Sequence, residues 1–550
     1  MQNNRPETLA IRTVNQYRRR DVISYLSVRY YVESLAARTD HWANNAAIDL
    51  VLTRKSSSYF KTYHFKEIDE NGEIQYREIY LPSANEALAE AALLNECSKY
   101  SEFSNDSTCV FSYNLVRNLD RTGSFKQYIV GLRERQNAIT KACEDNKDGI
   151  VRHTDIKQFY PSVSLELASR IWQRTCDDAE IDTKFRLLGQ ELISGYGTVN
   201  ENNALIVGPA FCHFIANLVL KELDIHFSNK LPAKYFRYVD DITLVGNKTS
   251  VDNSIKAIKE KLGSIGLLLH DDTSPKNIQG STLEWLSYRH DFHESHRPIS
   301  WKTLIGDLRR FLLLYPDKKE DLKHALQNEG FRIPLYDYMA TTKERTFLET
   351  LLNLVTDIRF RIRARGISIQ SLIRQCRFLR NCYKNEVDDL LKTLNDEHGF
   401  DRKSKITKIR YRASRLIYLA SEQDLHNLAV SLYLIPELKF HATVLESIRS
   451  KNIDKVISLG TNCAQAAAQA FKACSSTVFL TLQELTPVQE QSLAIFQLYA
   501  IPVEGGQVPT CDLFEFATLG CNNYLMTCED SFIKEISCLH GVQETIRHSV

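Results

Sequence analysis

The pattern of hydrophobic and polar positions divides the chain into three parts. In the first part, residues 59–65 and 73–81 alternate between apolar and polar side chains, which predicts two strands. Asn71 and Gly72 lie between them and are typical of a tight hairpin turn. Helical spacing predicts one helix over residues 18–37 and another over 84–97.

The second part, from about residue 111 to 290, alternates short apolar segments with amphipathic helical patterns. Strands are expected at residues 149–154, 234–238, 242–245 and 283–288, and helices at 162–174, 210–227 and 254–263. A very tight turn joins the strands at 234–238 and 242–245. This texture predicts a mixed fold of strands and helices around one sheet.

In the third part, after about Trp301, apolar residues recur at helical spacing and short polar breaks separate the segments. Helical segments are expected at residues 304–314, 347–355, 367–382, 387–394, 414–420, 425–433, 444–448 and 464–473. They indicate stacked helix pairs, although no strict sequence period is present. We therefore expect three regions, at residues 1–110, 111–300 and 301–550, in line with a length of 550 residues.

Composition narrows the class of protein. Hydrophobic residues make up 43% and charged residues 25%, as in ordinary globular proteins. Because 69 Lys and Arg balance 68 Asp and Glu, a uniformly basic surface is excluded while local basic patches are not. The 13 cysteines form no C-x-x-C pair, so reduced, buried thiols of a cytoplasmic protein are expected. No apolar run reaches roughly 18 residues, so no membrane helix is expected.

Two acidic sites carry the most chemical information. Asp155 stands where an apolar strand ends and a helix begins, and Asp240 and Asp241 stand at the turn between two apolar strands. Adjacent carboxylates repel each other, and burial increases that cost, whereas a divalent cation removes it. Carboxylates are ligands that suit Mg²⁺, and two such ions support in-line phosphoryl transfer. The alternative is a polar β-turn without chemistry.

The neighbours of these residues carry a resemblance to reverse transcriptases. The segment 238–241, Tyr-Val-Asp-Asp, resembles the Y-x-D-D box in its expected hairpin, and residues 155–160 resemble the first metal-binding box. Residues 203–220, 266–270 and 283–288 resemble the template- and nucleotide-contacting box, the following box and the primer-grip strand. The resemblance implies an α+β right-hand polymerase with fingers and palm, followed by an all-α helical-repeat region.

The resemblance also implies roles for individual residues. Asp155, Asp240 and Asp241 would be the catalytic carboxylates and, with the backbone carbonyl of Ile156, would hold two Mg²⁺ ions, for which Mn²⁺ can substitute. Tyr160 would stack under the incoming sugar and favour deoxynucleotides. Gly208 would let the backbone approach the nucleotide or the template.

Departures from the usual boxes point to a subclass. Leu205-Ile206-Val207-Gly208 replaces the usual L-P-Q-G, and Gly208-Pro209 resembles abortive-infection and "unknown group" reverse transcriptases of bacterial antiphage defence. The helical region is similar in layout to the C-terminal region of those enzymes. The lysine usual in the fourth box is displaced to Lys276, which leaves its role as a general acid open.

Three basic clusters add candidate contacts to nucleotides and nucleic acid. Arg117, Arg121 and Lys126 precede the palm and are candidates for cradling the triphosphate. Further along the chain, a second and a third cluster are candidates for tracking the phosphate backbone of a nascent strand. The second consists of Arg359, Arg361, Arg363 and Arg365, and the third, within residues 402–415, includes Lys408, Arg410 and Arg412. Solvated helix faces are the alternative for all three clusters.

Three functions follow as hypotheses. The first is an antiphage DNA polymerase that joins dNTPs into single-stranded DNA, in the template-independent, protein-primed manner of some relatives, which also form homo-oligomers. Six tyrosines of the helical region carry candidate priming hydroxyls: Tyr383, Tyr411, Tyr418, Tyr433, Tyr499 and Tyr524. The second hypothesis is an RNA-templated reverse transcriptase that uses a dedicated noncoding RNA. The third is a catalytically silent palm that serves as an RNA-binding scaffold.

Overall fold

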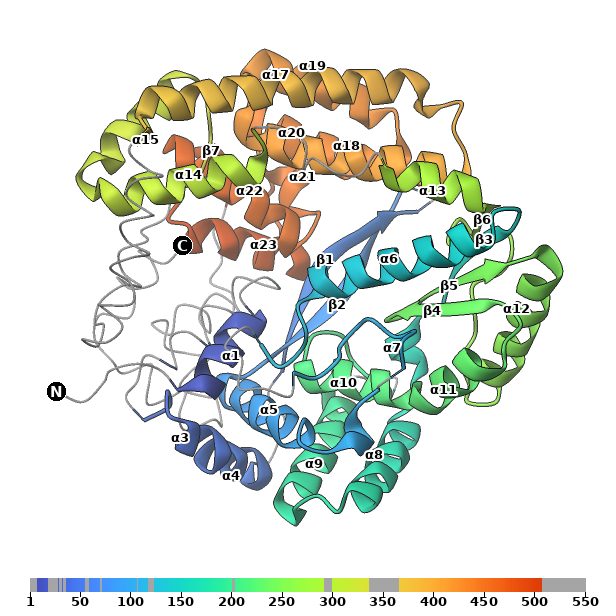
Figure 1. The fold of residues 1–550 in the computed structure, drawn as a ribbon. Helices are drawn as coiled ribbons and strands as arrows, with labels where there is room; N and C mark the ends of the chain where they lie inside the picture. Colours follow the sequence, from blue (N-terminus) through green and yellow to red (C-terminus); the bar gives the residue numbers. More distant parts are fainter. Residues whose placement is uncertain are drawn as a thin grey trace.

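The computed structural model describes residues 7–17, 28, 32, 36–54, 59–69, 72–105, 107–116, 123–199, 203–290, 299–335 and 366–506. It shows a mixed α/β protein in which helices surround small sheets (Figure 1). Within these ranges no helix is both long and apolar enough to cross a bilayer. The helix expected at 347–355 and most of the one expected at 18–37 lie outside the described residues.

The predicted hairpin is present near the start of the chain. Strand β1 (Tyr59–Ile68) pairs antiparallel with β2 (Ile74–Pro82). Helix α5 (Ala84–Cys97) follows and begins at Ser83, which forms a capping box with Glu86. Three short helices pack near α5: α1 (Thr8–Tyr17), α3 (Asp40–Asn44) and α4 (Ala46–Thr53). These contacts bury α5 on nearly all sides, as its alanine- and leucine-rich sequence allows.

The central sheet has four antiparallel strands in the order β4-β5-β3-β6. Their bounds are β3 (Ile150–Asp155), β4 (Lys234–Tyr238), β5 (Asp241–Gly246) and β6 (Ile278–Ser281). The first three confirm predicted strands. Apolar side chains of β3, β4 and β5 are buried beneath helices that precede or follow the strands.

Helices cover this sheet and extend below it in Figure 1. They are α6 (Tyr128–Asp145), α7 (Phe159–Ser162), α8 (Leu165–Ala179), α9 (Thr183–Val199), α10 (Ala210–Val219), α11 (Lys221–Lys230) and α12 (Lys248–Gly263). The expected single helix at 210–227 is two helices that meet at Leu220. A short 3₁₀ turn, η1 (Ser101–Phe103), packs against α8.

The strand expected at residues 283–288 is wrong. Helix α13 (Thr282–His290) occupies these positions, and the edge strand β6 ends just before it. The side chain of Ser281 accepts a hydrogen bond from the backbone N–H of Glu284 at 3.0 Å, which favours a helical turn here. Trp285 is buried while Leu283 is 61% exposed, so the apolar residues in this segment do not form the alternating face of a strand.

The third region is helical in its described residues, apart from two two-residue strands, β7 (Val478–Phe479) and β8 (Val503–Glu504). Its helices are α14 (Trp301–Leu314), α15 (Lys319–Asn328), α17 (Ile369–Leu394), α18 (Gly399–Leu419), α19 (Glu422–Tyr433), α20 (Lys439–Ser450), α21 (Asp454–Ile457), α22 (Thr461–Cys474) and α23 (Pro487–Leu498). Two 3₁₀ turns separate some of them, η3 (Pro316–Lys318) and η5 (Pro436–Leu438). The segments predicted at 367–382 and 387–394 form one helix, α17, and the segment predicted at 414–420 is the last part of the longer helix α18.

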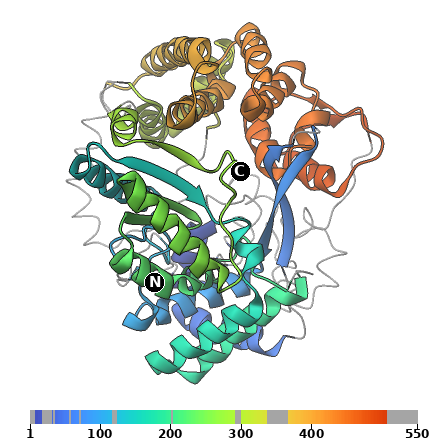
Figure 2. The same cartoon turned by 90° about the vertical axis from the view of Figure 1, so that its right-hand side faces the viewer.

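This helical region contacts both the hairpin and the sheet. The backbone N–H of Phe65 in β1 donates to Asn462 Oδ1 at 3.0 Å, and Tyr76 Oη donates to the Ser458 carbonyl at 2.5 Å. At the other contact, the ring of Phe400 at the start of α18 lies edge-on to Trp285 of α13, with 5.1 Å between centroids. Figure 2 shows the hairpin extending from the sheet side of the molecule to the helical region.

Candidate active site

The sheet register brings the three predicted carboxylates together. Asp155 is the last residue of β3, and it faces Asp241, the first residue of the antiparallel strand β5. The backbone N–H of Ile156 donates to the carbonyl of Asp240 at 3.1 Å, which ties the end of β3 to the turn of the neighbouring hairpin. Residues 85 positions apart in the chain therefore meet because these two strands are neighbours in the sheet.

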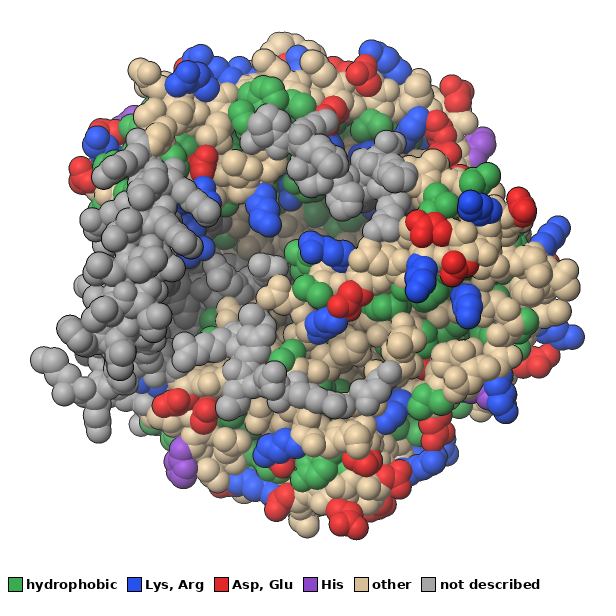
Figure 3. Space-filling model, in the orientation of Figure 1, with side chains coloured by type: hydrophobic (Ala, Val, Ile, Leu, Met, Phe, Trp, Pro, Cys, Tyr) green, Lys and Arg blue, Asp and Glu red, His purple; other side chains and the backbone are tan. Residues whose placement is uncertain are grey.

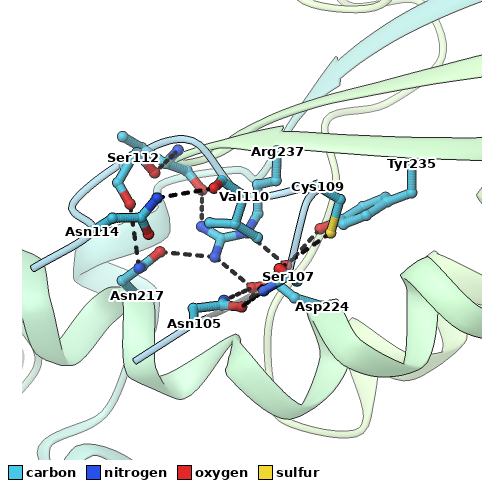
Figure 4. Close-up of polar contacts among 11 residues, drawn as sticks. Asn105, Ser107, Cys109, Val110, Ser112, Asn114, Asn217, Asp224, Tyr235 and Arg237 are labelled. Atoms are coloured by element: carbon cyan, nitrogen blue, oxygen red, sulfur yellow. Dashed lines mark hydrogen bonds and ion pairs between the residues drawn. The ribbon is translucent and has the colours of Figure 1, made fainter. Parts of the chain in front are cut away.

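The turn that carries Asp240 has an unusual backbone. Val239 has a φ of +58°, a left-handed conformation that a β-branched residue adopts only under strong constraint. Two hydrogen bonds supply that constraint: the Val239 N–H donates to Ser112 Oγ at 2.8 Å, and its carbonyl accepts from Arg237 Nη1 at 2.7 Å. Figure 4 shows Ser112 and Arg237 among the polar contacts beside this hairpin.

Arg237 itself is held by a buried network. Its guanidinium donates to both oxygens of Asp224, with Nε–Oδ1 at 2.7 Å and Nη2–Oδ2 at 2.5 Å, and both side chains are almost completely buried. Tyr235 and Asn105 also donate to this carboxylate, at 2.9 and 3.0 Å (Figure 4). A fully hydrogen-bonded ion pair therefore anchors the turn that positions Asp240.

Asp155 is buried but only partly satisfied. One carboxylate oxygen, Oδ2, accepts a hydrogen bond from Lys276 Nζ at 2.9 Å and lies 3.8 Å from His270 Nε2. The other oxygen, Oδ1, is buried without a hydrogen-bond partner among the described residues. A buried anionic oxygen without a donor is costly, and a cation would relieve that cost.

The ionised form of Asp240 is also disfavoured unless positive charge lies nearby. Burial, and next the negative charges of Asp155 and Asp241, raise its pKa to about 7. At neutral pH this carboxyl is therefore poised between its protonated and ionised forms. Bound divalent metal would favour the ionised form, because it supplies the missing positive charge.

Asp241 lies in a different electrostatic environment. Its Oδ1 is 3.2 Å from His153 Nε2, and its Oδ2 is 3.8 Å from Arg135 Nη1. Burial alone would raise the pKa of Asp241, but the hydrogen bond from His153 and the nearby positive charges of Arg135 and Lys403 lower it to about 2. Asp241 is therefore ionised at neutral pH and is already paired within the chain.

A short relay fixes the imidazole that holds Asp241. Arg135 Nη2 donates to Thr243 Oγ1 at 2.8 Å, and Thr243 Oγ1 lies 3.1 Å from His153 Nδ1. Burial lowers the pKa of His153, so its neutral form is favoured. Neutral His153 then accepts from the threonine at Nδ1 and donates to Asp241 from Nε2. The sequence predicted Asp241 as a metal ligand, and that role stays a prediction.

Two lysines supply positive charge near the carboxylates. One is the displaced Lys276, whose Nζ donates the hydrogen bond to Asp155 Oδ2. Burial alone would lower the pKa of Lys276, but this hydrogen bond raises it above its ordinary value. Lys403 comes from α18, one turn after Phe400, and has electrostatic contact with Asp241 and Asp155. Burial among its neighbours lowers the pKa of Lys403, although solvent reaches the side chain.

Sequence reasoning placed Lys403 in the third basic cluster but gave it no role at the carboxylates. Only the packing of α18 against α13 and β6 brings it there, so no local signal could have found it. The same packing accounts for Phe400, whose ring fills the space above Gly280 of β6. In Figure 3 a hollow lies below the helical region, with Lys and Arg side chains near its rim.

Tyr160, the expected sugar-stacking residue, is buried at the start of the segment after β3. Its hydroxyl is hydrogen-bonded to His213 Nδ1 of α10. His213 in turn stacks on Tyr113, with 4.6 Å between ring centroids and planes 6° apart. The aromatic group therefore has a fixed position near Asp155, and its contact with a nucleotide sugar stays a prediction.

Gly208 has a different explanation from the one the sequence suggested. It has a φ of +136°, and a Cβ at this position would lie 2.1 Å from the carbonyl oxygen of Tyr80 in β2. The neighbouring Val207 carbonyl accepts from the Tyr80 N–H at 2.8 Å. Close packing against the hairpin therefore requires glycine here, and an approach to nucleotide or template stays a prediction.

The predicted basic contacts are only partly described. Arg117, Arg121, Arg359, Arg361, Arg363 and Arg365 lie outside the described residues. Lys126 forms an exposed ion pair with Glu134 at 2.6 Å. Arg410 donates to the Glu437 carbonyl at 2.9 Å, and Arg412 pairs with Glu386 at 2.8 Å. Lys408 also lies on α18. For Arg410 and Arg412, the structure supports a packing role within the helical region.

The carboxylate site offers oxygen donors of the kind that divalent cations bind, although its side chains do not form a complete coordination sphere. No group of three or more His, Cys, Asp or Glu side chains in the described ranges has a metal-binding arrangement. The Oδ1 of Asp155, unpaired among the described residues, and the carboxyl of Asp240 nevertheless provide hard oxygen donors at the end of β3 and in the adjoining β4–β5 turn. Two carboxylates are a common protein contribution to Mg²⁺ that is otherwise bound by water and phosphate.

The comparisons with known proteins add no family. No protein-family model matches the chain, and no curated protein matches it significantly. The resemblance to reverse transcriptases therefore stays a prediction that rests on the sequence motifs.

Proposed function

We propose that this chain is a DNA polymerase of the reverse-transcriptase type that adds dNTPs to a 3′-hydroxyl. The observation that supports it most is the pairing of an under-satisfied carboxylate at the end of β3 with a carboxylate of raised pKa in the neighbouring β4–β5 turn. Within the described part of the chain, Asp155 keeps a buried oxygen without a donor, and Asp240 has a pKa of about 7. A structural role would not require these like charges to lie side by side, whereas metal-dependent phosphoryl transfer does.

In this mechanism Asp155 and Asp240 would hold Mg²⁺, with the Ile156 carbonyl as a further oxygen. The bound metal would lower the pKa of the attacking 3′-hydroxyl and stabilise the leaving pyrophosphate. Lys276, whose pKa is raised, would keep its proton close to the reacting phosphates. Lys403 would attract the triphosphate to the carboxylates. His153 holds Asp241 ionised, which adds negative potential beside the metal ligands.

An incorporation assay tests this proposal. Purified protein is treated with nuclease, supplied with labelled dNTPs and Mg²⁺, and its products are separated on a denaturing gel. The wild type should extend product, whereas Asp240→Asn and Asp155→Asn should not. Asp252→Asn, an exposed acid on α12, is the matched control and should keep full activity. Equal incorporation by Asp240→Asn and the wild type would refute the proposed metal site.

The same assay separates the modes of synthesis that the motifs leave open. Label that stays with the protein until proteolysis would indicate protein priming without a template. Activity that returns only with co-purified RNA would indicate an RNA-templated enzyme with a dedicated noncoding RNA. No incorporation under either condition, with nucleic-acid binding retained, would favour the catalytically silent RNA-binding scaffold. We place the polymerase in antiphage defence and in homo-oligomers on the motif resemblance alone.

The structure narrows the search for a priming hydroxyl. Among the six candidate tyrosines, Tyr383 and Tyr499 are buried, whereas Tyr433 is 60% exposed. Tyr524 lies outside the described residues. Tyr433→Phe should therefore be the first tyrosine variant in a protein-priming assay, with Tyr383→Phe as a buried comparison.

A further inference from the structure

The helical region contains a cavity whose residues lie far from the three aspartates in sequence. Its polar side chains include an arginine and a histidine. Its volume is about 340 Å³, and it lies among α14, α18, α20 and α22. This volume is at the lower end of the range of small-molecule sites, roughly 300–1,000 Å³. The lining contains three aromatic side chains, one arginine and one histidine: Trp301, Tyr418, Phe440, Arg415 and His441.

Aromatic side chains form part of the wall. The rings of Trp301 and Tyr418 stack with 6.0 Å between centroids and 23° between planes. The Tyr418 hydroxyl donates to Gln469 Oε1 at 3.0 Å, which fixes that ring. Phe440 packs on Phe65 of the hairpin, with 4.7 Å between centroids. Fixed aromatic groups of this kind favour flat ligands.

His441 provides a buried acceptor without a partner. Its side chain is 6% exposed, and burial, with a smaller effect of Arg410, lowers its pKa to about 3, so the ring is neutral at pH 7. The Ser414 hydroxyl donates to the Arg410 carbonyl at 2.8 Å, so its hydrogen is already used. His441 Nε2, 3.2 Å from Ser414 Oγ, must then be the donor. The lone pair on Nδ1 is left buried and unpaired among the described residues.

Arg415 provides a cation whose hydrogen bonds are mostly unused. Its guanidinium lies 3.9 Å from the centre of the Tyr411 ring, and Nη1 makes one long hydrogen bond, 3.4 Å, to the Tyr411 carbonyl. Nε is buried without a hydrogen-bond partner in the described part of the chain. Among the described residues, neither a carboxylate nor any other acid lines the cavity. An anionic group is the natural partner for such a guanidinium.

We infer that this cavity binds a nucleotide, with its planar base among the aromatic side chains and its phosphate at Arg415. An N–H of the base would donate to His441 Nδ1, which meets the need of that buried acceptor. This site is separate from the proposed polymerase site, since it contains none of the three aspartates and needs no metal. The inference therefore stands whether or not the chain polymerises DNA.

Calorimetric titration of the full chain with 5′-AMP and 5′-GMP tests the inference. EDTA is present and the background is Asp240→Asn, so that metal-dependent binding at the carboxylates is removed. We expect saturable binding of at least one nucleotide. Adenosine, guanosine and inorganic phosphate should each bind at least about tenfold more weakly, because each lacks one of the two recognised groups. Absence of saturable binding by both nucleotides would overturn the inference.

Two variants locate the site. Arg415→Gln should weaken binding at least about tenfold, and Trp301→Leu should weaken it too. Arg374→Gln, at an exposed position on α17, is the matched control and should bind like the parent. Urea unfolding of each variant separates loss of binding from loss of folding. Unchanged affinity in both cavity variants would show that the nucleotide binds elsewhere and would overturn the assignment.

Discussion

Two buried carboxylate sites lie near the β4–β5 hairpin, and they are built in opposite ways. Asp224 accepts hydrogen bonds from Arg237, Tyr235 and Asn105, so every part of its charge is matched. Asp155 keeps one oxygen that has no donor among the residues the structure describes, and Asp240 beside it has a raised pKa. A satisfied buried charge holds structure together, whereas an unsatisfied one lowers stability unless a cation binds. By this contrast, Asp224 stabilises the turn, and Asp155 and Asp240 form the site proposed to be reactive.

The largest expected effect concerns activity at the unsatisfied site. Asp240→Asn should reduce dNTP incorporation by at least about 10³-fold, because loss of a metal ligand removes several kcal/mol of transition-state stabilisation. The same variant should leave the chain as stable as the wild type, or more stable, in the absence of metal, since it removes a repelling charge. Incorporation kinetics and urea unfolding measure the two effects. A marked loss of stability would mean that Asp240 belongs to the anchor instead.

The satisfied site should behave in the reverse way. Asp224→Asn leaves the guanidinium of Arg237 buried without its counter-ion, so we expect a loss of about 3–5 kcal/mol in the free energy of unfolding. Urea denaturation followed by circular dichroism measures this loss. The exposed Asp252→Asn control should stay within about 0.5 kcal/mol of the wild type. A change as small as the control's would show that the ion pair does not hold the fold.

The contrast also predicts how stability depends on pH. Asp240 has a folded pKa of about 7, above its value of about 4 in an unfolded chain, so the folded state retains a proton there. In EDTA, stability should therefore fall by roughly 2–4 kcal/mol between pH 4 and 7 because of this group. Subtracting the curve of Asp240→Asn from that of the wild type isolates the effect. Parallel curves would contradict the raised pKa.

Added Mg²⁺ should sharpen this result. Because the metal binds the ionised carboxylate, its stabilising effect on the wild type should grow as pH rises from 5 to 8 and be absent in Asp240→Asn.

Asp241 should affect stability in the opposite direction from Asp240. Its pKa is lowered to about 2, so its contribution to stability is present above about pH 4 and is lost as pH falls toward 2.

The sequence predicted more of the carboxylate site than of its surroundings. Asp155 at a strand end and Asp240 at a tight turn follow from local patterns, since alternation and turn length determine where strands stop. The strand expected at 283–288 was wrong because the same apolar residues also suit a helix, and the serine hydrogen bond at Ser281 could not be foreseen. Lys403 and the cavity around Arg415 depend on how distant helices pack, which no local pattern records.

The smallest expected effect concerns two cations of α18, one paired with a carboxylate and one unpaired in the described residues. Arg412 is paired with Glu386 at 2.8 Å, whereas Lys403 makes no hydrogen bond or ion pair in the described residues and faces the carboxylate site. Lys403→Ala should raise the KM for dNTP about tenfold, about 1.4 kcal/mol, with little effect on unfolding. Arg412→Ala should instead lower stability by about 1 kcal/mol and leave KM unchanged. Steady-state kinetics on both variants distinguish the two roles. A higher KM for Arg412→Ala with an unchanged KM for Lys403→Ala would contradict this assignment. It would mean that α18 contacts the substrate through the third basic cluster, and that Phe400 only packs α18 against α13.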